Sequence, residues 1–118
     1  MKRRFIAVCA VLLVFSTLAA GCQPKKVDGV ITEAWAGKLA LSYLPIVYDR
    51  INTAGHFHFE LVNPRVVDVN ISEKESICIV EIRGMVMEHP AFPKGYETVL
   101  WIYLDPHTGE YQDFHEAL

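Results

Sequence analysis

The chain has 118 residues, of which 52% are hydrophobic and 21% charged, and its formal net charge is −3. This length allows one small domain with a single core. An acidic chain lacks the basic surface that nucleic-acid-binding proteins need, so no nucleic-acid partner is expected.

The first 22 residues have the three parts of a secretory signal. Three cationic residues, Lys2, Arg3 and Arg4, precede an uncharged apolar stretch at 5–15, and small residues follow at 16–22. The apolar stretch is shorter than the roughly 20 residues that a membrane-spanning helix needs. The pattern therefore predicts an export signal.

The end of this segment, Ala19-Ala20-Gly21-Cys22, resembles the lipobox of bacterial lipoproteins, with Ala19 where leucine is usual. In that family the cysteine thiol receives a diacylglyceryl group, and a peptidase then cuts just before the cysteine. The resemblance implies a signal peptide at 1–21, a palmitate-type lipid on Cys22 and an extracytoplasmic domain held at the cell membrane. The alternative is an ordinary signal peptide or an uncleaved signal anchor, with Cys22 as a free thiol.

Cleavage before Cys22 would leave 97 residues and, by removing Lys2, Arg3 and Arg4, would change the formal net charge from −3 to −6. Such a domain has no polybasic patch for anionic lipid, so the lipid chain has to supply the anchoring. Cys78 would be the one remaining unmodified cysteine. It lies within an apolar run at 77–80, which predicts a buried, unreactive thiol and no intrachain disulfide.

Helical signals fill the first part of the domain. Residues 22–30 are polar, with Pro and Gly, and are predicted to form a tether. Thr32 is a suitable helix N-cap, and apolar residues at three- and four-residue steps then predict a helix as far as Leu44. Pro45 should end or kink this helix, and a second helical piece is expected at 46–51.

From residue 56 onward the hydrophobic period changes to two, which predicts strands. Strands are expected at 56–61, 67–71, 76–87, 96–104 and 110–114. Turns or loops are expected at 63–64, 72–76, 89–95 and 105–109, where Asn, Asp, Pro, Ser or Gly gather. Gly84 is expected to mark a bulge.

Helices followed by strands predict an α+β fold, with the N-terminal helix packed on one face of a four- to five-stranded antiparallel sheet. The single domain is expected to span 31–118. The predicted contact between helix and sheet comprises Trp35, Leu39, Phe57, Phe59, Val67, Val69, Val80, Ile82, Leu100 and Ile102. The predicted opposite sheet face comprises His56, His58, Asp68, Asn70, Glu81, Arg83, Trp101 and Tyr103.

Two segments resemble parts of PepSY domains. Residues 31–40 (ITEAWAGKLA) resemble their opening helix, and residues 103–111 (YLDPHTGEY) resemble their closing hairpin. The resemblance implies a small extracytoplasmic binding module, with an envelope protein or a peptidase as partner, and no catalytic residue. A cystatin-like shape, in which a sheet grips a helix, fits as well. Alternatively, Asp105-Pro106-His107-Thr108-Gly109 is simply a favourable turn sequence.

Two surface constellations are candidates for function. His56 and His58 are two residues apart on a predicted strand, and such a pair can bind a transition metal; the alternative is a solvated polar face. Trp101, Tyr103 and Arg83 are candidates for a recognition patch, because aromatic residues and Arg are enriched in binding hot spots. The alternative is a second small core, covered by residues 46–51 or 90–95.

Enzyme signatures are absent from the sequence. It contains no nucleophile elbow, no phosphate-binding loop and no dinucleotide fingerprint. We therefore expect no enzymatic activity and no cofactor, and we expect the domain to act by binding.

Overall fold

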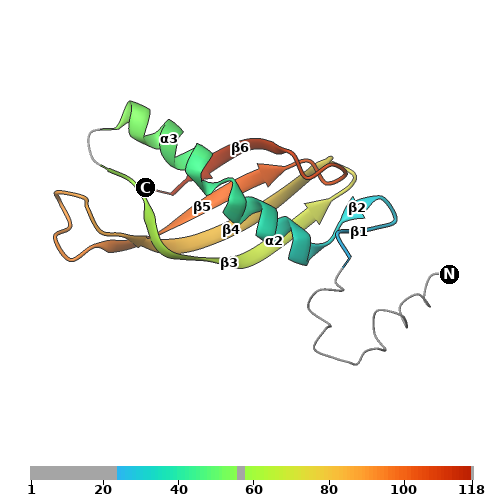
Figure 1. Ribbon diagram of the computed structural model, residues 1–118, viewed down its shortest axis with the longest axis horizontal. Helices are drawn as coiled ribbons and strands as arrows, with labels where there is room; N and C mark the ends of the chain where they lie inside the picture. Colours follow the sequence, from blue (N-terminus) through green and yellow to red (C-terminus); the bar gives the residue numbers. More distant parts are fainter. Residues whose placement is uncertain (1–23, 56–57, 118) are drawn as a thin grey trace, which may run out of the picture.

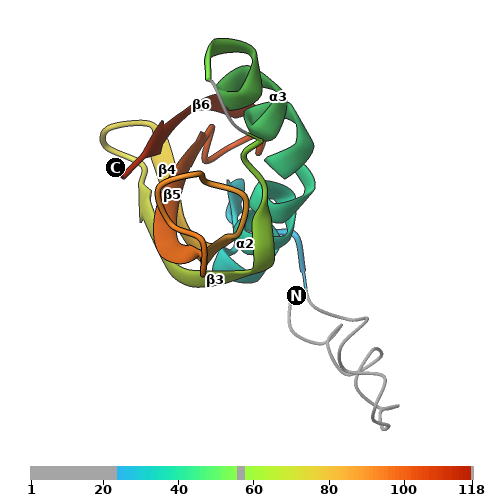
Figure 2. The ribbon, with the colours of Figure 1, turned by 90° about the vertical axis from the view of Figure 1, so that its left-hand side faces the viewer.

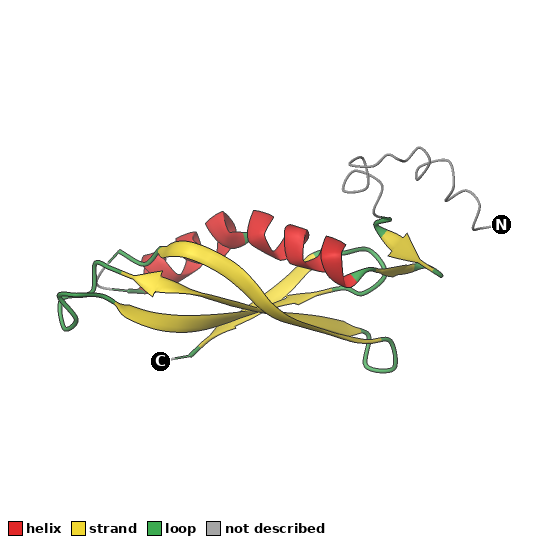
Figure 3. Cartoon of the chain, turned by 90° about the horizontal axis from the view of Figure 1, so that it is seen from below, coloured by secondary structure: helices red, strands yellow, loops and turns green. Residues whose placement is uncertain are grey.

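The computed structural model describes residues 24–55 and 58–117. Helices α2 (Glu33–Ser42) and α3 (Leu44–Ala54) lie on one face of a four-stranded antiparallel sheet (Figures 1 and 3). The strands follow one another across the sheet in chain order: β3 (Leu61–Ser72), β4 (Ile77–Val86), β5 (Tyr96–Leu104) and β6 (Tyr111–Glu116). Seen end-on, the helices lie on one side of the curved sheet (Figure 2). The predicted α+β fold, with a helix packed on one sheet face, is confirmed.

A small hairpin precedes the helices. Strands β1 (Lys26–Val27) and β2 (Val30–Ile31) are joined by Asp28 and Gly29, which both have positive φ, as a two-residue hairpin turn requires. The N–H of Ile31 donates to the carbonyl of Pro106 at 2.8 Å. The segment that the sequence predicts as a tether therefore contains secondary structure from Lys26 onward and is attached to the sheet.

Helix α2 begins where the sequence predicts it. The Thr32 hydroxyl accepts a hydrogen bond from the N–H of Trp35, the N-cap interaction expected of a threonine there. The residues that the helix buries are small: Ala36, Gly37 and Ala40. The predicted contacts Trp35 and Leu39 pack only partly buried at the margin of the core, so the central helix-to-sheet contact is made by smaller residues than expected.

Helix α3 confirms the second helical piece. Pro45 lies in its first turn, where a missing N–H removes no helical hydrogen bond, and Tyr43 joins the two helices. Leu44 and Val47 are the buried residues of this helix. The break predicted at Pro45 lies two residues earlier, at Tyr43, and it separates two consecutive helices on the same face of the sheet.

The first strand of the sheet, β3 (Leu61–Ser72), corrects two predictions. The strand predicted at 56–61 is wrong at 58–60 and correct at Leu61, and residues 56–57 lie outside the described residues. Asn63 and Pro64 do not form a turn between strands. They lie within β3, where two residues oppose one on β4 and the register shifts between Val62 and Arg65.

The register shift at Asn63-Pro64 lies opposite Gly84 of β4, where the two strands approach closely. A Cβ at Gly84 would lie 2.9 Å from the Cβ of Leu61, which is too close for any larger residue without a shift. The expectation of a bulge near Gly84 is correct in place, but the one extra residue is on β3, and Asn63 takes the positive φ of 54°.

A second register shift separates Val66 from Asp68. It turns Val66 toward the helices, where it packs against the core, and leaves Val67 outward and 43% exposed. The prediction that Val67 belongs to the core is wrong, because an extra residue reverses the side-chain alternation.

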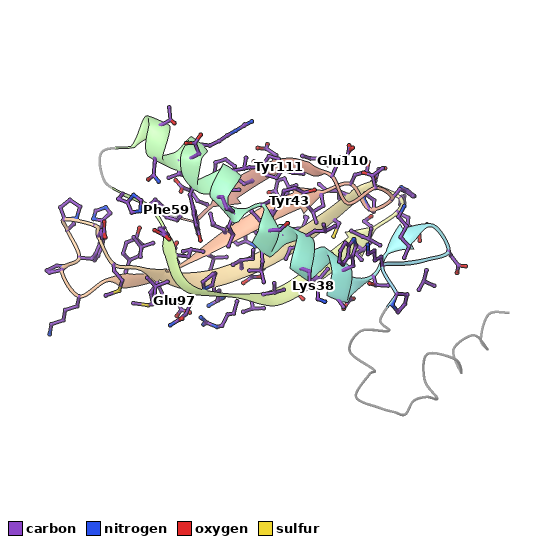
Figure 4. The ribbon with its side chains drawn as sticks, viewed as in Figure 1. Lys38, Tyr43, Phe59, Glu97, Glu110 and Tyr111 are labelled. Carbon is purple, nitrogen blue, oxygen red and sulfur yellow. The ribbon has the colours of Figure 1, made fainter. Side chains whose placement is uncertain are left out.

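Strands β4 (Ile77–Val86) and β5 (Tyr96–Leu104) follow the predicted alternation closely. Strand β6 (Tyr111–Glu116) extends two residues beyond the strand predicted at 110–114, and its register with β5 shifts between Tyr111 and Asp113. The helix-facing residues of these strands carry the core. The fully buried apolar side chains of β4 and β5 are Cys78, Val80, Ile82, Val86, Leu100, Ile102 and Leu104. Tyr43 also reaches the β5–β6 turn, where its hydroxyl donates to the carbonyl of Gly109 at 3.0 Å and its ring lies beside Tyr111 (Figure 4).

A candidate binding surface on the open face of the sheet

The sheet face opposite α2 and α3 is the strongest candidate for a functional surface. No described helix or strand lies over it, since both helices and their connection are on the other side (Figure 3). The predicted cover by residues 46–51 does not occur, because that segment is part of α3. The loop at 87–95 extends beyond the end of the sheet (Figure 1). We call this surface the open face.

Alternation along the strands decides which residues the open face contains. On β4 the even-numbered residues 78–86 are buried, as are 98–104 on β5, and the odd-numbered residues between and beside them are half-exposed or exposed on the other face. The residues concerned are Ile77, Ile79, Glu81, Arg83, Met85, Glu97, Val99, Trp101 and Tyr103. The structure thus places Trp101, Tyr103 and Arg83, the three residues of the predicted patch, on one face, together with Asp68 and Asn70 of β3.

One row of the open face crosses all four strands. Asp68, Glu81, Trp101 and His115 are successive cross-strand partners. The rings of Trp101 and His115 stack, with centroids 5.6 Å apart and an interplanar angle of 29°. The sequence offers His115 as one possible third ligand for the His56/His58 pair but does not place it in this patch, because the pairing of β6 with β5 sets the contact and no sequence signal fixes that register.

The rows of side chains on either side of the Trp101 row form an apolar strip that is bordered by polar and charged residues. Asn70, Ile79, Tyr103 and Asp113 form one row, so Ile79 and Tyr103 continue the apolar surface of Trp101. In the opposite direction, Arg83 lies directly across from Val99. The open face therefore presents half-exposed aromatic and aliphatic side chains between polar edges.

Both arginines of the open face, Arg65 and Arg83, form ion pairs with glutamates of the same face. Arg83 Nε donates to Glu81 Oε2 at 3.2 Å, and Arg65 donates from a terminal guanidinium nitrogen to Glu97 Oε2 at 2.6 Å. Both pairs are exposed enough to contribute little to stability, about 0–1 kcal/mol each. Their effect is to hold the arginine side chains at one end of the face.

The predicted metal pair cannot be described as a pair, because His56 lies outside the described residues. His58 is exposed, is not in a strand, and has its Nε2 3.1 Å from Glu60 Oε1. Within residues 24–55 and 58–117, no group of three or more His, Cys, Asp or Glu side chains is arranged to hold a metal ion.

Cys78 is buried, as predicted, and burial raises the pKa of its thiol to about 11. The thiolate is the reactive form of cysteine, so this thiol is poorly placed for nucleophilic chemistry at neutral pH. The thiol instead fills space in the core, beneath the helices.

A second, smaller feature lies at the end of the sheet near the 87–95 loop. An open cavity of about 370 Å³ is lined by His89, Phe92, Tyr96, Glu97, Thr98, Val99 and Ala117. The Phe92 and Tyr96 rings pack 4.7 Å apart, and the Thr98 hydroxyl donates to the carbonyl of Ala117. These contacts fix the loop and the end of the chain to β5.

Glu116 is the least satisfied acidic side chain nearby. Its Oε1 is buried without a hydrogen-bond partner among the described residues, and burial raises the pKa of its carboxyl. Its cross-strand partner is the buried Leu100, so Glu116 faces the helix side and is not part of the open face.

Comparison of the chain with protein-family models, with curated proteins and with solved structures found no significant match. The similarity of residues 31–40 and 103–111 to PepSY domains therefore stays a prediction. Among the residues that the structure describes, no helix is long and apolar enough to cross a membrane.

Proposed function

We propose that this protein is a non-enzymatic binding module of the bacterial cell envelope, anchored to the membrane by lipid on Cys22. The observation that supports the binding role most directly is the open face, with Trp101 and Tyr103 half-exposed on the same face as Arg83, which lies across from Val99. Aromatic residues and Arg are the types most enriched in binding hot spots, and an apolar centre with a polar edge is the usual organisation of an interface.

The finer features of the fold agree with this role. The two helices pack on one face of the sheet and complete the core there, and no described helix or strand covers the other face, which leaves it open to a partner. We propose a PepSY-like module of this kind, with an envelope protein or a peptidase as partner. The proposal assigns no catalytic residue.

The lipid anchor predicts a clear result for Cys22→Ala. Cells expressing the wild-type chain and labelled with radioactive palmitate should show a labelled band, and the variant should show none, because the thiol that forms the thioether is gone. Cys78→Ala is the control and should keep the label, since its thiol is buried. Persistent labelling of the Cys22 variant would refute lipidation at this position.

The binding role predicts a face-specific cross-link in cells. A photo-reactive amino acid at Val99, on the open face, should give a discrete heavier band, whereas the same group at exposed Lys38, on the outer side of α2, should not (Figure 4). Trp101→Ala combined with Tyr103→Ala should remove most of the Val99 product, because hot-spot aromatic residues contribute about 2 kcal/mol or more to binding. Equal products from both positions, or an unaffected product in the double variant, would contradict the proposal.

A further inference from the structure

The charges of the open face do not balance. Its four strands contribute the carboxylates of Asp68, Glu81, Glu97 and Asp113, together with the guanidinium groups of Arg65 and Arg83. Each arginine pairs with a glutamate. The two aspartates are left without a cationic partner among the described residues.

The positions of these two aspartates are informative. Asp68 is on β3 and Asp113 is on β6, the two edge strands, so the uncompensated carboxylates lie on opposite sides of the apolar strip. The strip between them consists of Ile79, Trp101 and Tyr103. Unpaired negative charge therefore borders half-exposed aromatic surface on both sides.

Asp68 is also in an unfavourable position within the sheet. It lies directly across from Glu81, and like charges directly opposite one another on antiparallel strands destabilise the pair. Arg83 relieves this repulsion from the Glu81 side alone. A cation delivered from outside the chain would relieve it from the Asp68 side.

From this arrangement we infer that the open face binds a protein segment that presents Arg or Lys side chains alternating with apolar ones. This inference rests on the proposed binding function and names the chemistry of the partner. The cationic groups pair with Asp68 and Asp113, and the apolar side chains cover Trp101, Tyr103 and Ile79. Arg fits this surface especially well, because its planar guanidinium pairs with carboxylates and also stacks on aromatic rings.

Fluorine NMR of the full chain, purified in a neutral detergent and labelled with 5-fluorotryptophan, tests the inference. The chain has two tryptophans, Trp101 on the open face and Trp35 on α2, so the second signal is an internal control. The probes are two synthetic peptides, one with alternating Arg and Leu and one with Glu in place of each Arg. We expect the Arg-Leu peptide to shift the Trp101 signal saturably and to leave the Trp35 signal unchanged.

Variants that neutralise pairs of carboxylates test which groups bind the cationic side chains of the peptide. Asp68→Asn combined with Asp113→Asn should weaken binding of the Arg-Leu peptide about fivefold, as expected for the loss of two exposed ion pairs. The matched control, Glu73→Gln with Glu75→Gln, changes the net charge equally in the exposed β3–β4 turn and should leave binding within about twofold.

Several results would overturn the inference. These are an equal response to the Glu-Leu peptide, an equal loss in the turn variant, or a Trp101 shift that follows protein concentration without peptide, which would indicate a second copy as the occupant. Absence of any shift while the Val99 cross-link persists in cells would overturn the inference but not the proposed function. Absence of the Val99 cross-link in cells that express the otherwise wild-type chain would overturn both.

Discussion

Replacement of Phe59 by Ala should destabilise the domain by about 3–5 kcal/mol, the range measured for loss of a buried aromatic side chain. Phe59 is 1% exposed and packs beside Tyr48 of α3, with ring centroids 6.1 Å apart. Its backbone is also fixed, because Asn52 Oδ1 accepts from its N–H at 2.6 Å and Asn52 Nδ2 donates to its carbonyl at 3.1 Å. Because this backbone is fixed, the surrounding residues cannot move in to fill the cavity that Ala would leave, and we expect a loss in the upper part of the 3–5 kcal/mol range.

Such a loss is large for a domain of this size, since the free energy of unfolding of most domains is about 5–15 kcal/mol. Thermal unfolding should show a fall in Tm of at least about 12 °C. Phe92→Ala is the matched control, because Phe92 is 46% exposed, and it should cost about 1 kcal/mol or less. If the two variants unfold at the same temperature, the placement of Phe59 in the core is wrong.

Phe59 also shows which features of this chain can be predicted from its hydrophobic pattern and which cannot. Alternation identified it correctly as a core residue, but assigned it to a strand at 56–61 that does not exist at 58–60. The side chain is buried because Asn52 holds the segment under α3 and next to the beginning of β3. A hydrogen bond between a helix and an irregular segment leaves no periodic signal, so the residue was predictable and its local structure was not.

Regular strands were predicted well and irregular ones were not. The alternation of β4 and β5 is uninterrupted, so their buried residues followed directly from the sequence. On β3, the pair Asn63-Pro64 is typical of a turn, yet the strand continues through it with one extra residue opposite Gly84. The second shift, at Val67, reversed the face of one residue. Both shifts depend on the partner strand, which sequence pattern does not contain.

The candidate surface, too, could be predicted from the sequence only in part. Alternation alone placed Trp101, Tyr103 and Arg83 on one face. Register across the strands then decides which side chains are neighbours, and it brings His115 onto Trp101 and Asp68 opposite Glu81. The features that suggest a cationic partner are therefore tertiary, whereas the aromatic residues at the centre were visible in the sequence.

The small residues of α2 lead to the last prediction. Ala40→Leu should destabilise the domain by about 1–3 kcal/mol, because extra methylene groups in a filled core force side chains and backbone apart. Ala40 is fully buried in the core cluster that joins the helices to the sheet. Gly37, one turn earlier, is equally confined, since a Cβ there would already lie 3.4 Å from Val66. Urea denaturation followed by circular dichroism would measure the change.

Ala34→Leu is the control for Ala40→Leu, because it makes the same substitution on the same helix at an exposed position. Ala34 is exposed on the same helix, and Leu is nearly as good a helix former as Ala, so this variant should change the free energy of unfolding by about 0.5 kcal/mol or less. Equal stability of the two variants would mean that α2 does not lie close against the sheet. A selective loss at Ala40 would show that the core depends on the close helix-to-sheet contact made by the small residues Ala36, Gly37 and Ala40.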